Sequence, residues 1–131
     1  MKTRILLFLF TLTIASPLFT NAQSNQTPLD GKKYKIELKK DGKIESEETL
    51  IFDTGSMKTP EREKLGFKEG TTYVKVTEDY YTWSCTVSND KVGAMAWQGT
   101  VKGDKIEGTC IWRKIGHEPP VKYTFAGTEV K

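Results

Sequence analysis

The chain has 131 residues, of which 37% are hydrophobic and 28% are charged, and its formal net charge is +3. This length is enough for one small domain and not for two. Lys2 and Arg4 lie in an N-terminal segment that we expect to be removed, which leaves a net charge of +1. No basic surface for nucleic acid is therefore predicted.

The N-terminal segment has the pattern of a secretory signal peptide. Lys2 and Arg4 precede an apolar run, and small or tolerated residues follow at Thr20-Asn21-Ala22. The apolar run is shorter than the roughly 20 residues that span a bilayer, so no transmembrane segment is expected in the mature chain. We predict a secreted or periplasmic protein with a signal peptide at 1–22, a flexible leader at 23–30 and a single domain at 31–131.

The first predicted hairpin begins with strict alternation of apolar and charged residues. Tyr34, Ile36 and Leu38 alternate with charges, which indicates a half-buried strand. A three-residue loop ending on Gly42 is expected to place Leu38 opposite Ile44. The charged residues of this hairpin are interpreted as a solvated face with cross-strand pairing; they include Lys32, Lys33, Lys35, Lys39, Lys40, Lys43, Glu45, Glu47 and Glu48.

The next segment is expected to contain one short helical turn between two strands. A short strand is expected within residues 54–59. Pro60 is followed by acidic residues, which is typical of a first helical turn, so a helical turn is predicted for residues 60–66 and Gly66 is expected to end it. Residues 71–77 are rich in β-branched side chains and indicate a strand.

Residues 80–115 are predicted to form a three-stranded antiparallel meander with one apolar face. A three-residue loop at 89–91 sets Trp83 opposite Trp97, and a two-residue turn at Gly103-Asp104 sets Trp97 opposite Cys110. Gly99 and Gly108 then lie side by side, as expected where a sheet bends sharply. The inward residues are Tyr81, Trp83, Cys85 and Val87, then Met95, Trp97, Gly99 and Val101, then Ile106, Gly108, Cys110 and Trp112.

A last strand is predicted at residues 121–127, where Val121, Tyr123 and Phe125 alternate with polar residues. The total is seven or eight short strands in sequence order with almost no helix. This indicates an all-β fold, a single up-and-down antiparallel β-barrel of about eight strands. Closure removes the unpaired edges that an open sheet would present. A β-sandwich fits the spacing almost as well and remains an alternative.

Several short motifs carry a family resemblance. They are Leu29-Asp30-Gly31, F-D-x-G-S at residues 52–56, Gly66-Phe67, and W-Q-G-T-V-K-G-D-K-I-E-G at residues 97–108. This order resembles small, functionally uncharacterised secreted bacterial domains of the lipocalin-like, or calycin, type. The resemblance implies a small β-barrel and no particular activity. The G-x-W motif of lipocalins is absent, and Gly31-Lys32-Lys33-Tyr34 stands in its place.

The two cysteines are predicted to be free. Cys85 and Cys110 lie on the first and third strands of the meander, about 9.6 Å apart at two strand spacings. A disulfide requires Cα atoms within about 6.8 Å. We therefore expect buried thiols, although composition alone favours a disulfide in a secreted chain.

No catalytic or metal-binding signature is present. His117 is the sole histidine and lies in a loop beside Glu118, without metal ligands at a recognised spacing. The chain has no G-x-S-x-G, H-E-x-x-H or Cys-His signature. Carboxylate pairs such as Glu47-Glu48 and Glu61-Glu63 are interpreted as exposed. We predict a protein that is not an enzyme and has no catalytic residue, metal site or cofactor.

The aromatic residues of the inner face leave two functional interpretations open. In the first, they line a pocket for a small apolar or aromatic ligand, as happens at barrel mouths. In the second, they fill the core, and the protein is a non-enzymatic module that meets a protein or a glycan through its exposed tyrosines and loops. In either case we expect a monomer. The predicted ligand-binding residues are Tyr81, Trp83, Met95, Trp97, Trp112, Tyr123 and Phe125.

Overall fold

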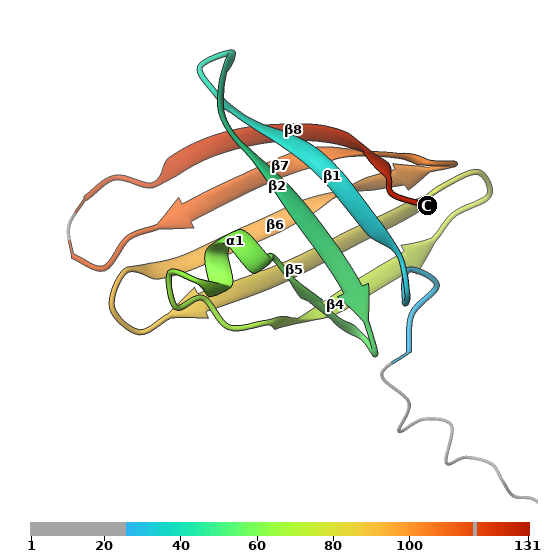
Figure 1. Cartoon of the computed structure of the whole chain (residues 1–131), viewed down its shortest axis with the longest axis horizontal. Coiled ribbons are helices and arrows are strands. Elements are labelled where there is room, and N and C mark those ends of the chain that lie inside the picture. Colours follow the sequence, from blue (N-terminus) through green and yellow to red (C-terminus); the bar gives the residue numbers. More distant parts are fainter. Residues whose placement is uncertain (1–25, 117) are drawn as a thin grey trace, which may run out of the picture.

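The protein is a closed eight-stranded antiparallel barrel (Figure 1). The computed structural model describes residues 26–116 and 118–131. Each strand pairs with the next, and β8 returns to pair with β1. This confirms the predicted up-and-down barrel over the sandwich. The elements are β1 (Lys33–Lys40), β2 (Lys43–Asp53), β3 (Ser56–Lys58), α1 (Pro60–Glu63), β4 (Gly70–Val76), β5 (Tyr81–Asn89), β6 (Gly93–Lys102), β7 (Lys105–Arg113) and β8 (Val121–Glu129).

Alternation along each strand sends one set of side chains into a single core. In β1 the burial pattern switches at every residue up to Leu38, and in β5 it does so from Trp83 to Asn89. The predicted signal peptide at 1–22, part of the leader, and His117 lie outside the described residues. The core consists of Leu29, Tyr34, Ile36, Leu38, Leu50, Phe52, Met57, Phe67, Trp83, Cys85, Val87, Met95, Trp97, Val101, Ile106, Cys110, Tyr123 and Phe125.

The first hairpin has a tighter turn than the sequence pattern predicted. Asp41 and Gly42 form a two-residue turn, both with positive φ (53° and 79°), which suits the twist of a hairpin. The extra residue lies further along, at Glu45, where a bulge shifts the register. Leu38 therefore pairs with Ser46, and the predicted pairing of Leu38 with Ile44 is wrong.

The β5–β6 loop also differs from the prediction, by one residue. Asn89 remains in β5 and pairs with Gly93, so the loop consists of residues 90–92. The Asn89 side chain fixes this arrangement, because its Oδ1 accepts a hydrogen bond from the Lys91 N–H and its Nδ2 donates to the Leu65 carbonyl. Trp83 consequently lies opposite Gly99, and not opposite Trp97 as predicted.

Glu48 is a further correction, since the sequence assigned it to the solvated face. It lies on the inward side of β2 and is only 2% exposed. Its carboxylate accepts hydrogen bonds from Arg62 of α1, and the shortest N–O distance is 2.6 Å. Glu61 of α1 accepts a hydrogen bond from the Thr49 N–H. These contacts hold the helical turn, which was predicted correctly, against the end of the barrel.

The described part of the predicted leader is packed against the barrel. Leu29 is fully buried, and the Gly31 N–H donates to the Phe52 carbonyl. Asp30 accepts hydrogen bonds from the N–H groups of Gly55 and Thr27 and from the Thr27 hydroxyl. Burial alone would raise the pKa of Asp30, but these hydrogen bonds lower it. Residues 29 and 30 are therefore structural, which corrects the expectation of a flexible leader at that point.

Candidate functional site

The residues predicted to bind a ligand all lie on the inward side of their strands. Met95, Trp97 and Phe125 are buried in the middle of the barrel. Tyr81 and Trp112 are half-buried at opposite ends. The Trp112 indole N–H donates to the Val92 carbonyl across the β5–β6 loop. The structure thus gathers the seven side chains in one interior, whereas their role in ligand binding stays a prediction.

Aromatic rings fill this interior by direct contact. Trp83 meets Phe52 at a centroid distance of 5.1 Å and Phe125 at 5.9 Å. Phe125 then meets Trp97 at 5.3 Å, and Phe52 meets Tyr34 at 5.8 Å. Separations of this size are those of packed aromatic pairs. Sequence reasoning missed Tyr34 and Phe52 as members of this cluster, although their alternation with polar neighbours was visible.

The two cysteines are free and buried, as the register predicted. Cys85 pairs with Trp97, and Trp97 pairs with Cys110, so a whole strand separates the thiols. Burial raises the pKa of Cys85 to about 11 and also raises that of Cys110. Reactive cysteines have a depressed pKa. Burial therefore favours the protonated, less nucleophilic form of both thiols.

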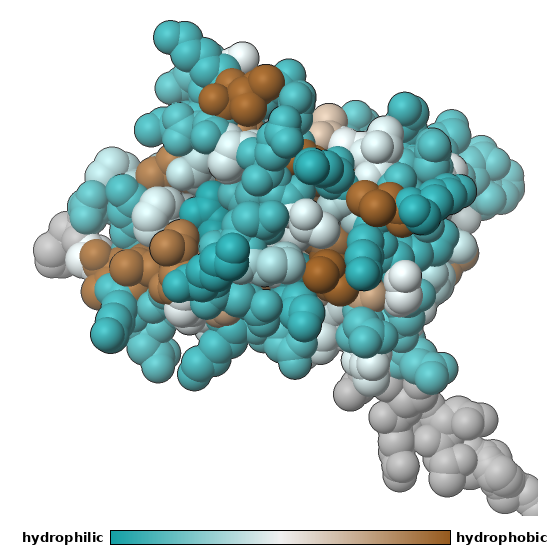
Figure 2. Space-filling view, viewed as in Figure 1, coloured by the Kyte–Doolittle hydropathy of each residue, from teal (hydrophilic) through white to brown (hydrophobic). Residues whose placement is uncertain are grey.

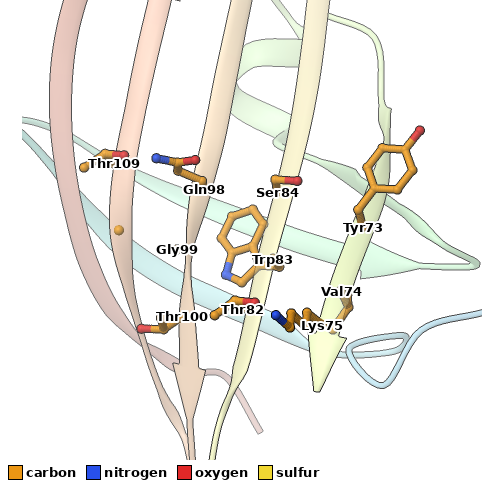
Figure 3. Close-up of a pocket in the computed structure, with 11 residues that line it drawn as sticks. Tyr73, Val74, Lys75, Thr82, Trp83, Ser84, Gln98, Gly99, Thr100 and Thr109 are labelled. Atoms are coloured by element: carbon orange, nitrogen blue, oxygen red, sulfur yellow. The ribbon is translucent and has the colours of Figure 1, made fainter. Parts of the chain in front are cut away.

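A hollow of about 610 Å³ opens on the outer surface of the barrel wall, over strands β4 to β7. Gly99, Gly108 and Trp83 line it at positions that face inward, and Gly99 pairs with both Trp83 and Gly108. Figure 3 shows Trp83 between two rows of outward side chains. One row contains Tyr73, Ser84, Gln98 and Thr109, and the other contains Lys75, Thr82 and Thr100.

The two glycines are required by close approach of the backbones. A Cβ on Gly99 would lie 2.2 Å from the Glu107 carbonyl oxygen, and one on Gly108 would lie 2.1 Å from the Gln98 carbonyl oxygen. Any side chain at either position must push the neighbouring strand away. The hollow is therefore built into the strand pairing and does not depend on a mobile loop.

The wall around this hollow consists mostly of uncharged side chains that can form hydrogen bonds, and Lys75 is its charged member. We use "neutral face" for nine outward side chains of β4–β8 that are threonine, serine, glutamine or tyrosine. In the described part of the chain, none of them forms a side-chain hydrogen bond within the protein. They are Thr71, Tyr73, Thr82, Ser84, Thr86, Gln98, Thr100, Thr109 and Thr124.

The neutral face contrasts with the outer surface of β1 and β2. There lysines and glutamates alternate with inward residues, and Lys35 and Glu47 form an ion pair at 4.0 Å. Figure 2, seen from the side of β1, β2 and α1, shows this surface as mainly hydrophilic with separate hydrophobic spots. The sequence pattern contained the signal for the neutral face, since hydroxyl residues alternate with the inward rings. That alternation was used only to predict which residues point inward.

Within residues 26–116 and 118–131, no cluster of side chains suitable for a metal ion is present. No helix in these ranges is long and apolar enough to cross a membrane. Comparisons of the chain with protein-family models, curated proteins and solved structures found no match. The site must therefore be interpreted from its own geometry.

Proposed function

We propose that the protein is a non-enzymatic binding module whose ligand occupies the outer hollow and is uncharged and rich in hydrogen-bonding groups. One observation carries this proposal: apart from Lys75, the polar side chains that border the hollow are neutral donors and acceptors that have no side-chain partner within the described part of the chain. Such side chains can exchange water for ligand hydroxyl or amide groups without the cost of removing a charge from water.

The interior supports this proposal indirectly. Rings in mutual contact fill the middle of the barrel, and Glu48 with Arg62 holds α1 at one end. The outer hollow is already open to solvent and requires no rearrangement. Binding there is consistent with a rigid wall, which loses little conformational freedom when a ligand binds.

Amide spectra of the labelled protein test the proposal. Small uncharged polar probes such as glucose and N-acetylglucosamine should shift amide signals of β4–β8 and leave those of β1 and β2 in place. Thr109→Lys introduces a charge in the middle of the neutral face and should abolish the shifts. Thr128→Lys is the matched control, because Thr128 is an exposed outward residue of β8 away from the hollow. Signals that do not move with any neutral probe would contradict the proposal.

A small ligand inside the barrel is the second candidate function, as predicted from the sequence. The observation in its favour is that three inward donors, the Tyr34 hydroxyl and the indole N–H groups of Trp83 and Trp97, have no partner in the described part of the chain. A fluorescent hydrophobic probe should then bind with saturation, and Trp97→Ala should change its affinity. Absence of probe uptake would leave the outer hollow as the sole candidate.

A further inference from the structure

We infer that the ligand of the neutral face is a linear neutral glycan that lies across the strands, with about one sugar unit for each strand. This inference rests on the proposed function and names the class of ligand. It follows from the spacing of the outward side chains, the shape of the hollow, the position of one exposed ring, and the chemistry that the face excludes.

The spacing comes from the strand register. The central row of the neutral face consists of direct cross-strand partners, one from each of five strands. Neighbouring strands lie about 4.8 Å apart, which is close to the length of one sugar unit in an extended glycan. A chain crossing the strands would therefore meet one hydrogen-bonding side chain for each sugar. The row is Tyr73, Ser84, Gln98, Thr109 and Thr124.

The shape is that of an elongated groove. The hollow over Gly99 and Gly108 continues toward β8 into a second hollow of about 450 Å³, with which it shares Thr100 and Thr109. The second hollow extends to Lys39 of β1. The part that the two hollows share is lined by glycine and threonine, whereas Glu107 and Lys39 border the second hollow.

The exposed ring lies at one end of the groove. Tyr73 is 69% exposed, and Figure 3 shows its ring standing away from the wall. A tyrosine ring offers an apolar surface together with a polar hydroxyl, which matches the apolar C–H face and the hydroxyl edge of a sugar ring. The row thus begins with a stacking platform and continues with amide and hydroxyl groups.

Other classes of ligand fit this face less well. A closed barrel has no free edge, so a peptide cannot join the sheet as an added strand. A nucleic acid requires a set of basic side chains that neutralise phosphates, whereas the two hollows are lined by two lysines, Lys75 and Lys39, together with the acidic Glu107. An apolar ligand would leave the amide and hydroxyl groups of the row without partners.

Trp83 provides a signal for binding in this groove. It is 3% exposed, pairs with Gly99, and is among the residues that line the hollow. Its indole N–H has no partner within the described residues. A sugar held over Gly99 should change the polarity around this ring and shift its fluorescence.

The experiment is a titration of the whole protein with soluble neutral oligosaccharides of the cello-, xylo-, manno-, laminari- and chito- series, from the disaccharide to the hexasaccharide. Calorimetry and tryptophan emission are recorded together. For one series, affinity should rise with each added unit up to about five units, the number of strands in the row, and then level off. Tyr73→Ala should lower the affinity by about fivefold. Tyr80→Ala is the matched control, because this exposed tyrosine lies outside the groove.

The outcomes separate this inference from the proposed function. Affinity that does not depend on chain length, or that is unchanged in Tyr73→Ala, overturns the linear glycan even if Thr109→Lys still abolishes binding. In that case the hollow remains the site of a smaller neutral ligand. If no sugar of any length binds while another neutral probe shifts the amides of β4–β8, the glycan is again excluded and the binding module stands.

Discussion

The β1–β2 hairpin and the β5–β7 meander contribute side chains to the same core but have different outer surfaces. Both send every second side chain into one core. The hairpin places charged side chains on its outer surface, and its register is interrupted by the bulge at Glu45. The meander places hydroxyl and amide side chains over the hollow and charged residues such as Lys102, Lys105 and Arg113 at the strand ends, and its register is unbroken over both pairings. The inward side chains therefore determine the barrel fold, whereas the outward side chains can differ between strands and so can be adapted to function.

The largest expected effect concerns the inward carboxylate of the hairpin. Glu48→Gln leaves Arg62 charged without its ionic partner near the core, and breaking a buried ion pair costs about 3–5 kcal/mol. Glu47→Gln is the matched control on the outward side of the same strand, where the side chain is 61% exposed. Urea unfolding measures both free energies. Equal losses in the two variants would show that the two sides of the hairpin do not differ as described.

The second effect concerns the glycine pair of the meander. Gly99→Ala forces the new methyl group against the Glu107 carbonyl, so we expect a loss of about 1–3 kcal/mol in the free energy of unfolding. Ala126→Val adds bulk to an exposed outward position of β8 beside the groove and should change stability by less than about 0.5 kcal/mol. A Gly99→Ala variant as stable as the parent would mean that the strands can separate without cost.

A third effect is expected in alkaline solution. Burial raises the pKa of Tyr34 from 10.0 to about 12, with further contributions from Glu129, Tyr81 and Asp104. The folded state therefore favours the neutral phenol, and this stabilisation is present below pH 10 and is lost as the pH rises toward 12. Thermal unfolding measured between pH 10 and pH 12 should show a smaller loss of stability in Tyr34→Phe than in the parent protein. Tyr73→Phe should lose as much stability as the parent. An unchanged alkaline profile in Tyr34→Phe would contradict the assignment.

The smallest effect is expected on the charged surface. Lys35 and Glu47 are 65% and 61% exposed and 4.0 Å apart. A double-mutant cycle with Lys35→Ala and Glu47→Ala should give a coupling of about 0.5 kcal/mol or less, reduced further by salt. A coupling energy several times larger would mean that the charged surface contributes to stability as strongly as contacts in the core.

The fold was predictable because it follows from the alternation of apolar and polar residues along the strands. The positions of the bulge and of the loops do not follow from that alternation. Alternation identified the inward residues of the first strand, the meander and the last strand and, with the Gly103-Asp104 turn, the pairing of Trp97 with Cys110. The loops after Lys40 and Asn89 were misjudged, because a bulge and a side-chain hydrogen bond moved the register without changing the apolar pattern.

The candidate site was less predictable for a related reason. Glu48 was assigned to the surface because a carboxylate is normally exposed, and its partner Arg62 lies fourteen residues away on another element. The neutral face depends on neighbours from five strands, and no local motif records their alignment. The concavity also depends on Gly99 and Gly108 meeting across two strands.

The pairing of β1 with β8 also determines how the domain can be joined to other units. Tyr34 near the start of β1 lies opposite Glu129 at the end of β8, and the Val130 N–H donates to the Lys33 carbonyl. The two ends of the barrel domain thus leave it at the same place, away from the groove. A short linker could connect them, and new ends could be opened at the exposed Gly103-Asp104 turn, to give a circularly permuted barrel with its wall intact.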